Sequence, residues 1–319
     1  MSIPKVSVVI PVRNGKDYLQ QALDSVLQQS FNDLELLLIN DGSTDDDYDR
    51  YALEDARVRV IHLAGTGVAA ARNVGTGQAR GELIAFLDAD DVWFPGKLAA
   101  QVRYMDSHPE VGVVFGSFLR WESGPDGAFA PAASLMTDCS GLEQPEAARS
   151  GWLYTRLLMG LLVGMNTAMV RRSVIDAIGG FNVSMQQGED YDFWLKASRI
   201  AEMHALDGTV ALYRIHKASA MHRLAPGNAL TTLLQAAKLR WGLRGPTGEP
   251  LSEAVFERRL AQIHFGHGYA HFWDGSRSVA RRSFYRAIRA RYRPWRSAAY
   301  VVLCSLPEVI RKRLQQVAN

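Results

Sequence analysis

The sequence has 319 residues, of which 47% are hydrophobic and 22% are charged, and its formal net charge at pH 7 is +3. This composition is typical of a globular protein and excludes a disordered, collagen-like or low-complexity chain. The two cysteines, Cys139 and Cys304, exclude a disulfide framework and a Cys-built zinc or iron–sulfur site, and such scarcity is typical of the reducing cytosol.

Charge is divided unevenly along the chain. Residues 1–220 hold 19 Lys and Arg against 28 Asp and Glu, whereas residues 221–319 hold 17 against 5. No uninterrupted apolar run reaches the roughly 18 residues that a membrane-spanning helix needs, and no secretory leader precedes the first predicted strand. We therefore expect a cytoplasmic protein with two domains, 1–220 and 221–319, that have different partners.

The first hundred residues alternate between short apolar runs, typical of buried parallel strands, and segments with one apolar helical face. The predicted strands are 6–10, 34–39, 58–63 and 83–87, and the predicted helices are 17–29, 68–79 and 97–107. This alternation predicts an α/β fold with a parallel sheet. Because ligands of such sheets bind beyond the carboxyl ends of the strands, polar residues at those ends are the candidate site.

Later segments are predicted from the same patterns. Strands are expected at 111–121, 166–170 and 210–214, and a helix is expected at 190–201. The segment 122–150 is rich in Gly, Pro, Ala and Ser and has no clear period, which indicates a lid, a binding loop or an insertion. Beyond residue 221 only helices are predicted, at 228–241, 253–269, 276–289 and 295–316.

The acidic run Asp88-Ala89-Asp90-Asp91 follows the predicted strand 83–87. If the chain turns there, Asp88 and Asp90 can face one ligand, and their hard oxygen donors suit magnesium or manganese that shares phosphate oxygens. The alternative is an acidic turn that caps the next helix.

Two other polar residues lie near strand ends. Asp41 follows the strand 34–39 and is interpreted either as an acceptor for a nucleobase N–H or as an Asx turn or helix N-cap. Arg72, in the helix 68–79, is interpreted either as a cation directed at a nucleotide or as a surface charge.

Seven motifs follow one another along the chain, at residues 6–14, 38–45, 71–75, 81–91, 179–181, 188–194 and 213–219, within roughly residues 4–220. In sequence, order and spacing they resemble the motifs of the family 2 glycosyltransferases with the GT-A fold. The resemblance implies a Rossmann-like, mostly parallel central sheet with flanking helices, followed by a C-terminal helical region. It also implies a metal-dependent, inverting transfer of a sugar from a nucleotide diphosphate donor.

The resemblance implies roles for single residues. Those that would bind the nucleotide are Pro11, Val12, Arg13, Asp41, Arg72 and Asp88, with Asp41 at the uracil edge. Those that would hold a Mn or Mg ion are Asp88, Asp90 and His216, although His216 can equally be a structural histidine. The cation would offset the charge that the leaving diphosphate gains.

Inversion needs a base on the face opposite the leaving group. The resemblance implies that this base is Asp190, beside Glu189, with Asp192 as the substitute. The alternative is a helix start at which carboxylates are favoured by the helix dipole. The residues implied to lie near the acceptor are Asn166, Thr167 and Trp194, and core packing is the alternative for the first two. The apolar segment 157–163 either packs below the acceptor or touches a lipid-linked one.

A basic region lies near the end of the chain. Eight arginines occur between residues 277 and 296, interleaved with Phe284, Tyr285, Tyr292 and Trp295. A helix with arginines on one side and apolar residues on the other binds anionic membrane surfaces, so we expect such a partner here. The alternative is a helical hairpin that packs on itself. We expect no nucleic-acid partner, because a catalytic domain precedes the region, although arginines among aromatic residues also occur in nucleic-acid-binding proteins.

Together these features predict an inverting glycosyltransferase of bacterial surface polysaccharide synthesis. The favoured donor is a UDP-sugar, the acceptor is a glycan or a lipid-linked glycan, and the location is cytoplasmic or peripheral at the inner face of the plasma membrane. One alternative is a sugar nucleotidyltransferase, which needs a Gly-rich phosphate loop where residues 12–15 offer one Arg and one Gly. The other is a catalytically inactive nucleotide-sugar-binding module, against which the presence of Asp88, Asp90 and Asp190 argues. The sequence leaves open the sugar, the linkage and the choice between uracil and thymine.

Overall fold

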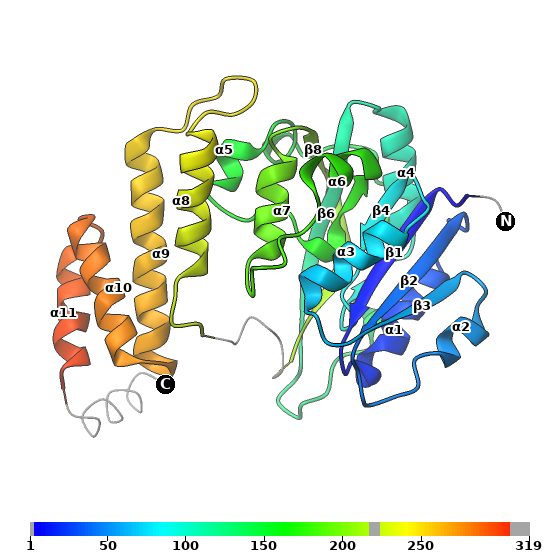
Figure 1. Ribbon diagram of the computed structural model, residues 1–319, viewed down its shortest axis with the longest axis horizontal. Helices are drawn as coiled ribbons and strands as arrows, with labels where there is room; N and C mark the ends of the chain where they lie inside the picture. Colours follow the sequence, from blue (N-terminus) through cyan, green and yellow to red (C-terminus); the bar gives the residue numbers. More distant parts are fainter. Residues whose placement is uncertain (1–2, 217–223, 307–319) are drawn as a thin grey trace. The chain divides into compact units, whose positions relative to one another are not determined.

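The computed structural model describes residues 3–216 and 224–306 (Figure 1). The chain divides into two compact units, one of Met1–His216 with Gly245–Thr247 and the other of Lys217–Arg244 with Gly248–Asn319. The last ten residues of the helix predicted at 295–316 lie outside the described residues.

The first unit is built on an eight-stranded sheet with the order β3-β2-β1-β4-β7-β6-β8-β5. Neighbouring strands are parallel in four pairs, whereas β7 runs antiparallel to β4 and β6, and β5 runs antiparallel to β8. This mixed, mostly parallel sheet confirms the predicted fold class. The strands are β1 (Val6–Val12), β2 (Leu34–Asp41), β3 (Val58–Leu63), β4 (Leu83–Phe86), β5 (Val92–Trp93), β6 (Val111–Glu122), β7 (Met169–Arg171) and β8 (Glu202–Ile215).

Helices flank this sheet (Figure 1). They are α1 (Lys16–Leu27), α2 (Arg50–Glu54), α3 (Val68–Gln78), α4 (Lys97–Ser107), α5 (Tyr154–Leu157), α6 (Arg172–Ile178) and α7 (Glu189–Ala197).

Two predicted strands need correction. Residues 166–170 begin as a 3-10 turn, Met165–Thr167, before β7, and residues 210–214 are only the last part of the long strand β8. After Glu122, which ends β6, the segment to residue 150 holds two short 3-10 turns, Ala132–Ser134 and Ala147–Arg149, and an isolated bridge from Pro145 to Leu206, which fits the predicted loop.

Close packing fixes α3 on the sheet. α3 contacts β1 and β2, and a Cβ placed on Gly75 would lie 2.4 Å from Cγ1 of Val9. Only glycine permits this approach. Because a helical turn has 3.6 residues, Arg72 lies about one turn before Gly75. The close contact of Gly75 with Val9 therefore sets the position of Arg72 over the sheet.

A buried carboxylate anchors the amino-terminal ends of the strands. Glu35, on β2, accepts hydrogen bonds from Ser7 Oγ (2.7 Å), from the backbone N–H of Arg80 (2.6 Å) and from Arg59 Nη1 (3.1 Å). Burial opposes ionisation of Glu35, but the hydrogen bonds from Arg80, Ser7 and Arg59 outweigh it and lower the pKa of this carboxyl. The opposite, carboxyl ends of the strands are left for the candidate site.

The second unit contains four described helices, α8 (Ala229–Trp241), α9 (Glu253–Asp274), α10 (Arg277–Arg289) and α11 (Pro294–Cys304). α10 packs against α9 and α11, which run side by side with it (Figure 1). Aromatic rings fill this contact, with Phe284 stacked on Tyr300 at 4.9 Å and Phe265 edge-on to Phe284 at 5.5 Å. Within residues 3–216 and 224–306, no helix combines the length and apolarity that a membrane crossing requires.

Candidate functional site

Loops at the carboxyl ends of β1 and β2 are tied together. Asn14 has a φ of 53°, a left-handed conformation that asparagine tolerates better than most residues. Its backbone N–H donates to Ser43 Oγ (2.9 Å), and its Oδ1 accepts from the backbone N–H of Thr44 (2.9 Å). The two loops therefore form one rim at this edge of the sheet.

Asp41, the last residue of β2, lies behind this rim and is 4% exposed. Its Oδ1 accepts from the backbone N–H of Thr66 (2.6 Å) and its Oδ2 from that of Gly67 (2.7 Å), the N-cap residue of α3. Burial raises the pKa of Asp41, but these hydrogen bonds and the charge of Arg13 outweigh it, so the net shift is downward. Asp41 is thus ionised and anchors the start of α3.

Three further predicted nucleotide residues follow one another on β1 and after it. Pro11 and Val12 are buried in the strand, whereas Arg13 is exposed. A Cβ on Gly65 would lie 3.6 Å from Arg13 Nη2, so the guanidinium lies against the loop that carries Thr66. The rim therefore combines one exposed cation with the buried carboxylate of Asp41.

Arg72 is buried, which excludes the surface-charge interpretation. Its Nη2 donates to Asp88 Oδ1 (2.7 Å) and its Nη1 to Glu189 Oε1 (3.0 Å), while its guanidinium lies 5.5 Å from the ring centre of Phe181. Burial disfavours the charge of Arg72, but Asp88 and Glu189 outweigh it and raise the pKa of the guanidinium. Arg72 therefore joins a carboxylate after β4 to one at the start of α7.

Asp190 lies next to this bridge and outside it. Its Oδ1 accepts from the backbone N–H of Tyr191 (2.7 Å), and none of the described residues donates to its Oδ2. Burial, with a further contribution from Asp88, raises the pKa of Asp190 more than Arg72 and the Tyr191 N–H lower it. Burial also raises the pKa of Glu189 against the opposing effect of Arg72. The carboxylate of Asp190 is thus left as an acceptor.

The other predicted site residues on α7 and before β7 are buried within the protein. Asp192 Oδ2 pairs with Lys196 Nζ at 2.6 Å, and Trp194 is fully buried. Asn166 and Thr167 are also buried, and Thr167 Oγ1 donates to the carbonyl of Gly164 (2.8 Å). These contacts agree with core packing, and the acceptor role of Asn166, Thr167 and Trp194 stays a prediction.

The acidic turn after β4 brings together two possible metal ligands. Asp90 Oδ2 lies 3.0 Å from Nε2 of His216, which follows β8, and the His216 ring lies 4.9 Å from that of Tyr18. Burial and the charge of Asp88 raise the pKa of Asp90 more than His216 lowers it. Within the described ranges, no three His, Cys, Asp or Glu side chains form a metal-binding group. A carboxylate and an imidazole fit a divalent cation that takes its remaining ligands from phosphate and water.

The sequence analysis predicted no role for Asp91 or Arg214, although Asp91 ends the motif 81–91 and Arg214 lies in the motif 213–219. Asp91 is fully buried, and its Oδ1 and Oδ2 accept from the Arg214 backbone N–H (2.8 Å) and from Asn166 Nδ2 (2.6 Å). Burial, with the charges of Asp90 and Asp88, raises the pKa of Asp91 well above its usual range. The signal in the sequence was that Asp91 is a third carboxylate in the short run that follows β4.

Comparison with known proteins shows that part of the chain matches the model of one protein family. The family model described as "Glycosyl transferase family 2" matches residues 7–137. An uncharacterized glycosyltransferase of Rickettsia felis is 27% identical over 240 residues, which cover 74% of this chain, and this chain spans only 38% of that relative's length. A putative teichuronic acid biosynthesis glycosyltransferase, TuaG of Bacillus subtilis, is 28% identical over 242 residues, or 75% of this chain and 86% of TuaG.

Solved structures share the fold. S. aureus TarS 1-349 in complex with UDP-GlcNAc superposes with a TM-score of 0.62 at 21% identity, over 93% of this chain and 84% of that one. The mannosyltransferase PcManGT from Pyrobaculum calidifontis, in complex with GDP-Man and Mn²⁺, gives a TM-score of 0.58 at 20% identity, over 96% and 87% of the two chains. Both share the mixed sheet with its flanking helices.

Proposed function

This chain belongs to glycosyl transferase family 2, and we propose that it transfers a sugar from a nucleotide diphosphate donor to an acceptor hydroxyl, with inversion at the anomeric carbon. One observation carries the proposal. The buried guanidinium of Arg72 holds Asp88 and Glu189 together at 2.7 and 3.0 Å, which brings the strand-end carboxylates and the Glu189-Asp190 pair to one place. These are the groups that such a reaction needs for the nucleotide, the cation and the proton.

The favoured donor is a UDP-sugar. Asp41 is ionised and held at the rim between β1 and β2. Its Oδ1 accepts from both the backbone N–H and Oγ1 of Thr66, whereas its Oδ2 accepts only from the backbone N–H of Gly67 among the described residues and keeps a second lone pair. Such a carboxylate accepts the N3–H of uracil, and equally that of thymine, while Arg13 supplies a cation beside it. The complex of TarS with UDP-GlcNAc supports this donor class.

A divalent cation, Mn or Mg, belongs to the proposal. Asp90 and His216 would hold it, with Asp88 beside them, and the Mn²⁺ in PcManGT supports the same requirement. When bound, the cation supplies Lewis-acid stabilisation of the leaving diphosphate.

Asp190 is the proposed base. Its Oδ2 accepts no hydrogen bond from the described residues, whereas the neighbouring Glu189 is held by Arg72. Burial raises the pKa of Asp190, which makes its carboxylate a better proton acceptor than an exposed aspartate. The charge of Arg72 opposes that shift and favours the ionised form. The proton of the acceptor hydroxyl therefore passes to Asp190 as the hydroxyl oxygen attacks the anomeric carbon.

The acceptor is proposed to be a glycan or a lipid-linked glycan of a bacterial surface polysaccharide. The name of TuaG, which refers to teichuronic acid biosynthesis, supports this class, although the two chains are only 28% identical.

Features of the second unit support the proposal that the protein attaches to an anionic membrane surface from the cytosolic side. No Asp or Glu occurs from residue 275 to residue 307. Seven arginines of this stretch have no ion pair within the part of the chain that the structure describes, and Trp295 beside them is 87% exposed. They are Arg281, Arg282, Arg286, Arg289, Arg291, Arg293 and Arg296.

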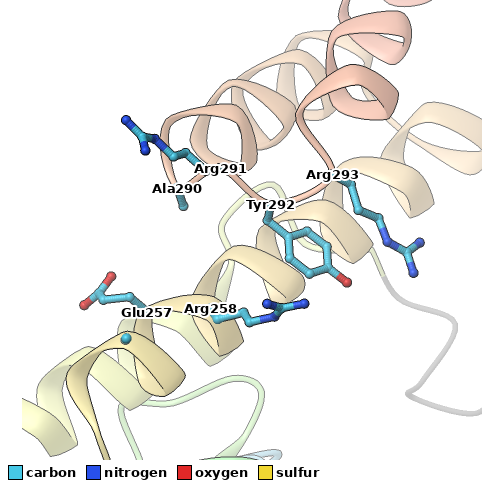
Figure 2. Close-up of a pocket in the computed structure, with 7 residues that line it drawn as sticks. Glu257, Arg258, Ala290, Arg291, Tyr292 and Arg293 are labelled. Carbon is cyan, nitrogen blue, oxygen red and sulfur yellow. The ribbon is translucent and has the colours of Figure 1, made fainter.

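Hollows in this basic surface have the charge and size for lipid phosphates. One of about 390 Å³ lies between α9 and the turn from α10 to α11 and is lined by Arg258, Arg291 and Arg293, and Figure 2 shows Arg258 and Arg293 beside the ring of Tyr292 at its wall. Glu257, the acidic residue of this wall, pairs with Lys238 Nζ at 3.1 Å. The net charge of the hollow is therefore positive.

Nucleotide binding tests the proposed function directly. Calorimetric titration with UDP, dTDP and GDP, each with and without Mn²⁺, is expected to show binding of UDP that Mn²⁺ strengthens. The Asp90→Ala variant is expected to lose the effect of Mn²⁺. UDP affinity that neither Mn²⁺ nor this substitution alters would overturn the cation assignment, and preference for GDP would overturn the donor assignment.

A further inference from the structure

Arg214, near the end of β8, is 3% exposed and contacts the acidic turn from the side. Its Nε donates to the backbone carbonyl of Asp90 (2.7 Å), and its own backbone N–H donates to Asp91 Oδ1 (2.8 Å). Its Nη2 reaches α1, where it donates to Gln21 Oε1 (2.6 Å). One arginine therefore links β8, the turn after β4 and α1.

Three aromatic rings contact the guanidinium of Arg214 and fix its orientation. The guanidinium carbon lies 3.9 Å from the ring centre of Trp121, 4.5 Å from that of Tyr18 and 4.9 Å from that of Phe129. Contacts of a cation with ring faces at these distances are favourable and directional. They fix the orientation of the Nε–H that points at Asp90.

The peptide between Asp90 and Asp91 is held at both of its ends. Arg214 binds the carbonyl of Asp90, and the buried side chain of Asp91 is held by Arg214 and by Asn166 Nδ2 (2.6 Å). The direction in which the Asp90 side chain leaves the backbone is therefore fixed by contacts that do not involve its own carboxylate.

His216 lies on the same stretch of chain as Arg214, and both its ring and the Arg214 guanidinium contact the ring of Tyr18. It follows Arg214 by two residues, and its Nε2 lies 3.0 Å from Asp90 Oδ2. Arg214 thus fixes two candidate ligands that are 126 residues apart in sequence, one through the turn after β4 and the other through the end of β8.

We propose that Arg214 is the positioning residue of the cation site, which sets Asp90 and His216 at the separation at which both can bind one divalent cation. This inference rests on the proposed function, because it concerns the cation of that reaction. Lysine cannot replace Arg214, because an ammonium group is a point charge without the planar set of donors that binds Asp90 and Gln21 and stacks on Trp121.

The test is Mn²⁺ affinity measured by electron paramagnetic resonance with UDP present, for the whole chain and for its Arg214→Lys variant. Loss of a residue that orients a metal ligand weakens metal affinity by about 10- to 100-fold, and a loss in this range is expected. UDP affinity without metal is expected to stay at the parental value, since Asp41 and Arg13 are untouched. Arg149→Lys is the matched control, because Arg149 also packs on an aromatic ring, 5.2 Å from the centre of Phe115, and bonds Ser117.

Parental Mn²⁺ affinity in Arg214→Lys would overturn the proposal, and so would an equal loss of metal-free UDP binding, which a merely structural role predicts. If Arg214→Lys does not fold, Gln21→Ala decides, because Gln21 is exposed and its truncation leaves the core packed. A smaller loss of Mn²⁺ affinity is expected for it, and none for Gln20→Ala, whose side chain bonds Asp24 instead. Equal Mn²⁺ affinity in both glutamine variants would also overturn the proposal. A parent protein that binds neither UDP nor Mn²⁺ refutes instead the proposed function itself.

Discussion

Replacing Asp190 by asparagine removes the proposed proton acceptor and leaves the other contacts of this side chain in place. The amide oxygen of the new side chain can still accept the Tyr191 N–H that Asp190 Oδ1 accepts at 2.7 Å, and the Arg72 bridge is untouched because Asp190 is not part of it. What disappears is the proton acceptor. A positioned general base contributes about 10²- to 10⁴-fold to a rate, which corresponds to roughly 2.7–5.5 kcal/mol of barrier.

The assay is release of UDP from the preferred donor, measured as kcat with acceptor or water, together with donor affinity by calorimetry. We expect kcat of Asp190→Asn to fall by that factor while donor affinity changes little. Asp176→Asn is the matched control, since it makes the same chemical change on an exposed aspartate of the same unit. Near-parental kcat in Asp190→Asn would refute the assignment, and a larger loss in Glu189→Gln would move the role to Glu189.

The same residue predicts a pH dependence. Burial raises the pKa of Asp190 above its ordinary value, against the opposing effects of Arg72 and the Tyr191 N–H. Because the base works only when ionised, kcat is expected to fall as the pH drops through this raised pKa. The acidic limb should therefore lie at higher pH than for an ordinary aspartate, and it should be absent in Asp190→Asn. A parental limb that persists in the variant would assign it to another group.

The remaining predictions concern the bridge, the rim and the basic surface. Arg72→Met leaves Asp88 and Glu189 without their counter-charge, so the free energy of unfolding from urea titration should drop by about 3–5 kcal/mol; an unchanged value would show that the bridge is not a stabilising element. Asp41→Ala removes the proposed acceptor of the uracil N3–H and should weaken UDP binding in calorimetry by about 1–3 kcal/mol, whereas parental affinity would remove Asp41 from the nucleotide site. Each Arg near an anionic membrane contributes about 1 kcal/mol, so a fourfold Arg→Gln variant should no longer sediment with anionic vesicles at low salt; equal binding of the parent to neutral vesicles would contradict the electrostatic mechanism. The four positions are Arg281, Arg282, Arg286 and Arg289.

The sheet and most helices of the first unit were predictable because the spacing of apolar residues there matches which positions of each strand or helix are buried. β1 and β2 are buried along their whole lengths, as their apolar runs predict, and α4 has the predicted bounds. β5 was not predicted as a strand at all, and β7 was predicted without its antiparallel direction, because strands of two and three residues carry no periodic signal. Their direction is set by pairing with β8, β4 and β6, which the local sequence does not encode.

The residues of the candidate site were predictable from the sequence, but the contacts between them were not. Motif resemblance pointed to Asp88, Asp90 and Glu189-Asp190, yet the burial of Arg72 between Asp88 and Glu189 depends on residues 16 and 117 positions away in sequence. The role of Arg214 was missed for the same reason. Its partners come from α1, the turn after β4 and β6, and a single sequence gives no measure of such distances.

Stereochemistry tests the central claim, inverting transfer from a nucleotide sugar, most directly. An α-linked UDP-sugar that the protein hydrolyses in the presence of Mn²⁺ can be followed by proton nuclear magnetic resonance before the released sugar mutarotates. A single displacement by water at the anomeric carbon, with Asp190 as base, predicts that the β-anomer appears first and that Asp190→Asn forms it more slowly by about 10²- to 10⁴-fold. Initial appearance of the α-anomer would contradict the account, because retention needs a second displacement or attack from the side of the leaving diphosphate.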